Sequence, residues 1–380
     1  HSATSTPPPT TSTGHSRPLT SIRKGDDNNY GMTATDSPEP MPELIQRLQR
    51  AVFEYPLSAD YCFLCAVPLD LANRIQEHVI PKWVQRRFDL WNETVTLLNG
   101  AGMKYWDMVI PCCKECNGTW LSRMENKVRT AVDAGADAVR ALPKMVLFQW
   151  LVKIFIGLLY KELISRGDRR DPDSPPILAP DALRHHQLLH LFLQTIWLDN
   201  RHETPDEACP SSIFILDTQR PATVRERFDL MDNFHGPTLA IRLGGVGIVA
   251  HFLEGGAHAA NLPAAMVHVG SLTLHPVQFR EYAARVFYGA SLLQLSVRGK
   301  LVGTADGSLA LLLRYIQREA RLFRDVDPDA YAERLAYYWG VPVNHVKYSD
   351  GRRVRSFLFD EDCNPRAMPP DAQVAIPPLE

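Results

Sequence analysis

Apolar residues recur along the first half of the chain at three- and four-residue intervals. That spacing is typical of helices and predicts them over residues 129–142, 143–165 and 180–199. The run 168–180 is rich in Asp and Pro and predicts a loop. A shorter helix is expected over residues 42–53.

After about residue 206 the pattern changes to short apolar runs. Residues 212–216, 239–243 and 246–253 are expected to be strands, the last two joined through Gly244-Gly245. Proline at position 276 suits the first turn of a helix and opens an amphipathic segment. The remaining expected elements are helices over 276–293, 309–324 and 328–339 and a hairpin over 346–348 and 354–359.

These patterns predict an α+β protein in five parts. The first residues are rich in Ser, Thr, Pro and Gly, which cannot bury a core. The Gly31-Met32 junction favours an expression-vector origin for residues 1–31, with a native flexible tail as the alternative. The parts are a disordered tail over 1–42, a metal-motif module over 43–128, a helical segment over 129–205, an α+β accessory domain over 206–365 and a flexible tail over 366–380.

Charge and cysteine content narrow the function classes. The net charge of −2 gives no global basic field, so any nucleic-acid binding must depend on a local patch. The apolar run 145–160 is interrupted by Gln149 and Lys153, which predicts a buried helix and no membrane partner. Seven cysteines in 380 residues make no disulfide framework. With no signal-peptide pattern, a cytoplasmic protein is expected.

Four of the cysteines form two C-x-x-C pairs, Cys62/Cys65 and Cys113/Cys116. Each pair can form a knuckle that presents two thiolates, and two knuckles close a tetrahedron around zinc. The alternative is four unrelated buried cysteines. Cys112 lacks the knuckle spacing. The pairs predict a structural Zn²⁺ site.

A carboxylate, an imidazole and an amide lie close to these pairs in the sequence. Glu77-His78 falls between the knuckles, within Glu77-His78-Val79-Ile80-Pro81, and Asn117 follows the last cysteine. Oxygen ligands suit a hard cation, and a neutral imidazole can accept a proton from water.

In combination, C-x-x-C, then Glu-His-Val-Ile-Pro, then C-x-x-C-Asn resembles the HNH nuclease motif over residues 60–128. The resemblance implies a ββα-metal finger with a structural zinc. It implies that His78 is the general base, and that Glu77 and Asn117 bind a catalytic Mg²⁺ or Mn²⁺.

Two departures from that motif concern the base and the metal. The asparagine that orients the histidine has no counterpart in the stretch 105–108, where Asp107 could accept the imidazole proton instead. The family's Lys or His after the last knuckle is also missing, and Glu125 or Lys127 could substitute.

Local cations are the expected phosphate contacts: Lys82, Arg86, Arg87, Arg123 and Lys127, with Arg129 nearby. A solvated helix face is the other interpretation of such a run. The expected function is a metal-dependent HNH endonuclease that hydrolyses DNA. The layout resembles bacterial phage-defence or toxin-like nucleases, which implies a regulatory or defence-complex protein partner. The alternative is a non-catalytic treble-clef zinc module that binds DNA or protein, and RNA cleavage stays open.

Two further patterns are interpreted structurally. Gly245-x-Gly247-x-x-Ala250 matches a dinucleotide-binding fingerprint but opens no helix, so a hairpin turn is expected. His186 and His190 have helical metal spacing without an accompanying glutamate, and they are expected at the surface or the edge of the core.

Overall fold

The computed structural model describes residues 58–168, 170–197, 209–303, 309–348, 353–370, 372 and 374–377. All of them belong to the unit Pro42–Glu380. The disordered tail predicted over 1–42, the helix predicted over 42–53 and the turn at 349–352 lie outside the described residues. The domain boundaries drawn from the sequence stay predictions, whereas the mixed α+β class is confirmed.

The first cysteine pair lies on the loop before an antiparallel strand pair, and the second lies at the end of that strand pair and in the helical turn that follows it. Strand β1 (Arg74–His78) pairs with β4 (Val109–Cys113), so that Glu77 lies opposite Ile110. A π-helical turn at Cys116–Leu121 then leads into α3 (Ser122–Ala134). The segment of the chain that connects β1 to β4 contains α2 (Lys82–Arg87), β2 (Thr94–Thr96), β3 (Gly102–Lys104) and a 3₁₀ turn at Tyr105–Asp107.

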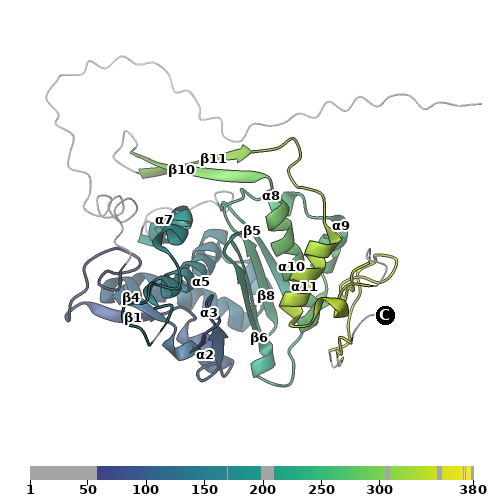
Figure 1. Ribbon diagram of the computed structural model, residues 1–380, viewed down its shortest axis with the longest axis horizontal. Helices are drawn as coiled ribbons and strands as arrows, with labels where there is room; N and C mark the ends of the chain where they lie inside the picture. Colours follow the sequence, from purple (N-terminus) through teal and green to yellow (C-terminus); the bar gives the residue numbers. More distant parts are fainter. Residues whose placement is uncertain are drawn as a thin grey trace, which may run out of the picture. The chain divides into compact units, whose positions relative to one another are not determined.

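Helix α5 (Lys144–Ile164) lies at the centre of the largest hydrophobic cluster. Its apolar residues surround the helix on all sides, which is typical of a helix with protein on every face. In Figure 1 it lies between the β1–β4 pair and the sheet that contains β5 and β8. One cluster therefore joins residues of the cysteine module, α5 and the sheet.

Two predicted helices are divided where the backbone cannot continue a helix. Gly135, at φ +114°, separates α3 from α4 (Ala136–Arg140), so the segment 129–142 is not one helix. His186 separates α6 (Pro180–His185) from α7 (Gln187–Gln194), which ends in a 3₁₀ turn at Thr195–Trp197.

In the described residues of the second half, a five-stranded sheet has the order β6-β7-β8-β5-β9. Alternate residues of β7 and β8 face opposite clusters: Ile241 and Ile248 belong to the α5 side, and Ala240 and Val249 to the α10 side. Both faces are covered, which explains why these strands read as continuous apolar runs. The bounds are β5 Ser212–Thr218, β6 Phe228–Asn233, β7 Thr238–Leu243, β8 Val246–His251 and β9 Thr273–Leu274.

Helix α10 (Pro276–Leu292) covers the second face and packs against α11 (Pro328–Trp339) (Figure 1). The fully buried Glu281 of α10 accepts hydrogen bonds from the amides of Phe357 and Leu358 at 2.6 and 3.2 Å. The C-terminal segment is thereby tied to α10. Two short helices, α8 (Ala257–Ala260) and α9 (Ala264–Val269), precede β9.

The helix predicted over 309–324 is wrong. Residues Leu309–Gln317 form strand β11, which pairs antiparallel with β10 (Leu295–Gly303). A short apolar run fits either periodicity, and the pairing with β10 decides between them.

The glycine-rich stretch is a hairpin turn, as predicted. Gly244 adopts φ +69° between the antiparallel strands β7 and β8. Gly247 lies within β8, where an added Cβ would stand 2.6 Å from Cε2 of Phe279. Close packing of α10 on the sheet therefore explains the second glycine.

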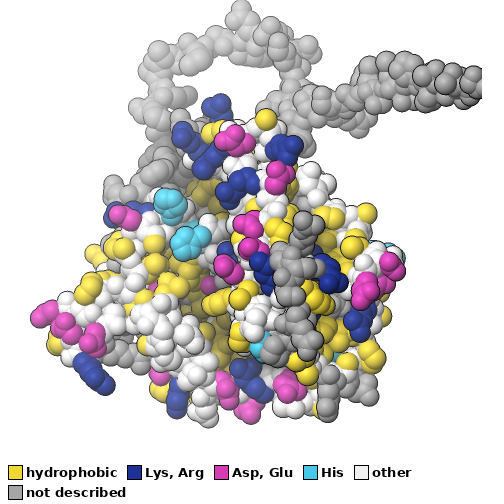
Figure 2. Space-filling model, turned by 45° about the vertical axis from the view of Figure 1, so that its right-hand side comes forward, with side chains coloured by type: hydrophobic (Ala, Val, Ile, Leu, Met, Phe, Trp, Pro, Cys, Tyr) yellow, Lys and Arg dark blue, Asp and Glu magenta, His cyan; other side chains and the backbone are white. Residues whose placement is uncertain are grey.

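Two surface properties bear on the expected partners. Figure 2 shows basic and acidic side chains interspersed over the face that it draws. Among the described residues, no helix has both the length and the apolarity needed to cross a membrane.

Candidate functional site

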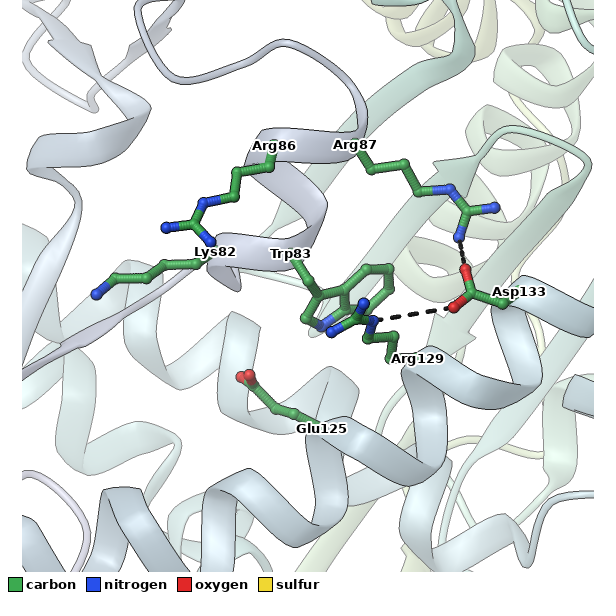
Figure 3. Close-up of a pocket in the computed structure, with 7 residues that line it drawn as sticks. All are labelled: Lys82, Trp83, Arg86, Arg87, Glu125, Arg129 and Asp133. Carbon is green, nitrogen blue, oxygen red and sulfur yellow. Dashed lines mark hydrogen bonds and ion pairs between the residues drawn. The ribbon is translucent and has the colours of Figure 1, made fainter.

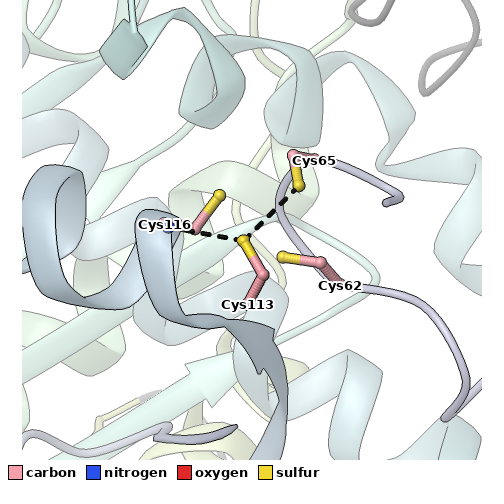
Figure 4. Close-up of side chains that lie close together, drawn as sticks. All are labelled: Cys62, Cys65, Cys113 and Cys116. Carbon is pink, nitrogen blue, oxygen red and sulfur yellow. Dashed lines mark hydrogen bonds between the residues drawn. The ribbon is translucent and has the colours of Figure 1, made fainter. Parts of the chain in front are cut away.

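The four paired cysteines converge on one point. Cys62 and Cys65 lie on the loop before β1, whereas Cys113 ends β4 and Cys116 begins the π-helical turn (Figure 4). All four are buried, and their Sγ atoms lie within 4.8 Å of one another. Residues from two distant parts of the sequence thus form a single thiol cluster.

The geometry of this cluster fits zinc. A Zn–S bond of about 2.3 Å places the sulfurs of an ideal tetrahedron about 3.8 Å apart. The Sγ atoms of Cys65 and Cys113 are 3.8 Å apart. The four cysteines could therefore hold a metal such as Zn²⁺.

The first knuckle is fixed by helix α7. His190 Nε2 lies 2.6 Å from the carbonyl oxygen of Phe63, and Gln194 Nε2 donates to the carbonyl oxygen of Leu64 at 2.7 Å. Both side chains are buried. His190 therefore orients the knuckle backbone, while the neighbouring His186 contacts the Phe155 ring at 5.3 Å. His186 therefore lies at the edge of the core, as predicted, whereas His190 is buried within the core.

Cys112 lies beside the cluster without belonging to it. Its Sγ is 3.9 Å from that of Cys62, and this contact together with burial raises the pKa of the Cys112 thiol well above its ordinary value. Cys112 therefore remains a thiol next to the four candidate ligands.

Glu77 and Asn117, the two residues expected to bind the catalytic metal, are in contact. Asn117 Nδ2 donates to Glu77 Oε2 at 2.5 Å. Burial raises the pKa of Glu77, while Lys153 opposes the increase. The cysteine framework brings these two residues together because Asn117 directly follows Cys116.

Lys153, from the middle of α5, reaches the same carboxylate. Its Nζ lies 2.5 Å from Glu77 Oε1 and 2.9 Å from Glu125 Oε1, and its side chain is 0% exposed. Burial opposes the charge of Lys153, but Glu125 and Glu77 outweigh that effect and raise its pKa. Two carboxylates therefore share one buried ammonium beneath the site.

The oxygen atoms of Glu77 and Asn117 are possible ligands for a catalytic cation. Glu77 has lone pairs beyond its two hydrogen bonds, and Asn117 offers a carbonyl oxygen beside it. An oxygen donor set of a carboxylate and an amide carbonyl fits a hard divalent ion that keeps most of its water ligands. Of the two residues expected to complete the metal site, Glu125 is linked to Glu77 through Lys153, which contacts both carboxylates. Lys127 is exposed on α3.

His78 is half-buried at the end of β1, and its ring stacks on Trp91 with centroids 6.0 Å apart. Burial, together with Lys82, Lys153 and Arg86, lowers the pKa of His78 to about 4. The imidazole is therefore neutral near pH 7, the state that a general base needs. Among the described residues, the His78 ring donates no hydrogen bond to Asp107, and the ring stacks on Trp91 instead.

A cavity of about 730 Å³ opens beside these groups, between α2 and α3. Figure 3 shows Lys82, Trp83, Arg86 and Arg87 entering it from α2, and Glu125, Arg129 and Asp133 from α3. Asp133 forms an ion pair with Arg87 and lies 3.9 Å from Arg129. The cavity thus has a basic lining next to the His78 site.

Three of the five predicted DNA contacts line this cavity: Lys82, Arg86 and Arg87. The other two, Arg123 and Lys127, are exposed on α3 and do not line it. The Arg123 guanidinium lies 5.6 Å from the centroid of the Trp120 ring.

Sequence reasoning missed Lys153 and Trp91. A signal for Lys153 was present, because a single lysine interrupts the apolar run 145–160. A charge in a buried helix requires a partner, which indicates a specific role. Trp91 gave no comparable signal.

The chain matches no protein-family model, no curated protein and no solved structure.

Proposed function

We propose that this protein is a metal-dependent endonuclease of the HNH type that hydrolyses DNA phosphodiester bonds. The contact between Glu77 and Asn117 beside the neutral His78 carries the proposal. The strand pair β1–β4 followed by α3, with four clustered cysteines at their junction, is compatible with a zinc-stapled ββα finger.

In this proposal the residues act on one phosphate. His78 removes a proton from water through an imidazole nitrogen, the water oxygen bonds to phosphorus, and the bond to the leaving oxygen breaks. Glu77 and Asn117 would hold Mg²⁺ or Mn²⁺, which offsets charge on the transferring phosphate and the leaving oxygen. Lys82 and Arg86, which form no ion pair within the described part of the chain, would contact the flanking backbone phosphates.

A plasmid-nicking assay tests the catalytic role. The wild-type chain is expected to nick supercoiled DNA with Mg²⁺ or Mn²⁺ and to be inactive with a chelator. His78→Ala is expected to lower the rate at least 100-fold, the usual effect of removing a general base. The exposed His235→Ala is the control and is expected to keep the wild-type rate. Equal rates for wild type and His78→Ala would refute the proposal.

A non-catalytic zinc module that binds DNA is the second candidate. The Lys153–Glu77 contact of 2.5 Å favours it, because an ammonium already engages the carboxylate expected to bind the metal. This candidate predicts DNA retention in a mobility-shift assay without cleavage under any metal. Parallel assays on an RNA substrate separate DNA from RNA specificity.

A further inference from the structure

The ammonium of Lys153 is surrounded by oxygen atoms. Besides Glu77 Oε1 at 2.5 Å and Glu125 Oε1 at 2.9 Å, Nζ lies 2.5 Å from the carbonyl oxygen of His78 and 3.3 Å from that of Val79. The carboxylates come from β1 and α3, and the carbonyls come from the last residue of β1 and the residue that follows it. We call these four oxygens the Lys153 cage.

The composition of the cage is that of a cation site. Two carboxylates and two backbone carbonyls are the ligand types that hard divalent ions take from proteins. An ammonium group has three protons to share among four acceptors. The oxygens therefore supply more acceptors than the three protons of one lysine can satisfy.

We propose that Lys153 is a resident cation that occupies a latent divalent-metal site next to the catalytic one. It blocks metal entry into the cage and leaves Glu77 Oε2, on the Asn117 side, as the oxygen available to a weakly held catalytic ion. The catalytic role of that ion rests on the nuclease function proposed above. The occupation of the cage by Lys153 is tested separately, by measuring metal binding.

Two opposing effects decide what loss of Lys153 would do. Removing a group that only positions a metal ligand weakens metal binding about 10- to 100-fold. Removing a unit positive charge about 4 Å away favours a divalent cation by on the order of a millionfold at an effective dielectric constant of about 20. Electrostatics should prevail, so the cage without its lysine should bind metal more tightly.

The test titrates purified full-length chain with Mn²⁺ and follows the electron paramagnetic resonance signal of the free ion. Lys153→Met is expected to bind Mn²⁺ at least tenfold more tightly than wild type. Its nicking rate should nevertheless fall, because the ion is drawn toward Glu125 and away from Asn117. The double variant Lys153→Met/Glu125→Gln should lose the gain, since one cage carboxylate is gone.

Lys161→Met is the matched control. Lys161 lies on the same helix and donates to the carbonyl oxygen of Val109 in β4, at 3.2 Å. Its replacement should leave Mn²⁺ affinity unchanged, whereas a nonspecific effect of losing a positive charge from α5 would appear in both variants. Retention of zinc and of the melting transition shows that each variant is folded.

Lys153→Gln, which keeps a hydrogen-bond donor, decides the matter if Lys153→Met does not fold. Unchanged or weaker Mn²⁺ binding in the folded lysine variants would overturn the proposal. The nuclease function fails separately, when wild type does not nick DNA while the variants still show the gain in Mn²⁺ affinity.

Discussion

Asn117 Nδ2 lies 2.5 Å from Glu77 Oε2, although the two residues come from the π-helical turn and from β1. The β1–β4 pairing and the cysteine cluster both hold this contact, because Asn117 follows Cys116 and Glu77 lies three residues from the start of β1. The cysteine cluster and the candidate catalytic site therefore depend on the same short segments, β1, β4 and the π-helical turn.

Removing one cysteine of the cluster should remove the metal. Cys65→Ser is expected to lower zinc content from about one ion per chain toward zero and to reduce thermal stability, because binding free energy is part of folding free energy. Cys363→Ser, at an exposed cysteine, should change neither. Elemental analysis with thermal melting checks both. Full zinc content in Cys65→Ser would exclude this cluster as the zinc site.

The cavity cations should control the salt dependence of DNA binding. Lys82 and Arg86 line the cavity, and among the described residues neither forms an ion pair. Lys82→Ala and Arg86→Ala should each weaken binding and reduce the slope of log affinity against log salt by about one. Fluorescence anisotropy at several salt concentrations measures this slope. Arg321→Ala, in an exposed ion pair, is the control, and equal slopes in all variants would contradict the prediction.

Gly247 should not tolerate a methyl group. An added Cβ would stand 2.6 Å from Phe279 Cε2 and 2.9 Å from Thr218 Cγ2, so Gly247→Ala is expected to cost about 1–3 kcal/mol of unfolding free energy. Gly102→Ala is the matched control, because its nearest atom in another strand lies 3.9 Å away. Urea denaturation compares the two. A Gly247→Ala protein as stable as Gly102→Ala would show that α10 can move aside.

Buried histidines should make the fold sensitive to acid. Burial lowers the pKa of His258 from 6.5 to about 4, and its Nδ1 lies 3.1 Å from Nδ1 of His251, whose pKa is lowered to about 3. Between pH 6.5 and about pH 4, His258 therefore binds a proton in the unfolded chain but not in the folded chain. The stabilisation from neutral His258 is therefore complete above 6.5 and is lost as the pH falls toward 4.

His258→Gln tests that contribution. It should reduce the slope of unfolding free energy against pH in this window by up to about 1.4 kcal/mol per pH unit. His235→Gln, at an exposed histidine, should leave the slope as in wild type. Denaturant melts at several pH values supply the slopes, and an unaltered slope in His258→Gln would remove this residue from the acid response.

Spacing along the chain was sufficient to predict the cysteine cluster, because each knuckle is local and two knuckles can share one metal. The ends of α11 also follow from local signals: Asp327 caps its first turn, and Gly340 at φ +68° ends it. Strand β11 could not be predicted in this way, since its conformation depends on pairing with β10. Lys153 was missed as a site residue because its partners lie 28 and 76 residues earlier.

The hydrogen bonds from α7 to the Cys62–Cys65 loop limit how far the chain can be shortened. A fragment that ended with α3 would leave the carbonyl groups of Phe63 and Leu64 without His190 and Gln194. It would also expose the surface that α5 covers. A fragment that keeps the Cys62–Cys65 loop in this conformation must therefore extend at least to residue 194, well beyond the last cysteine of the cluster.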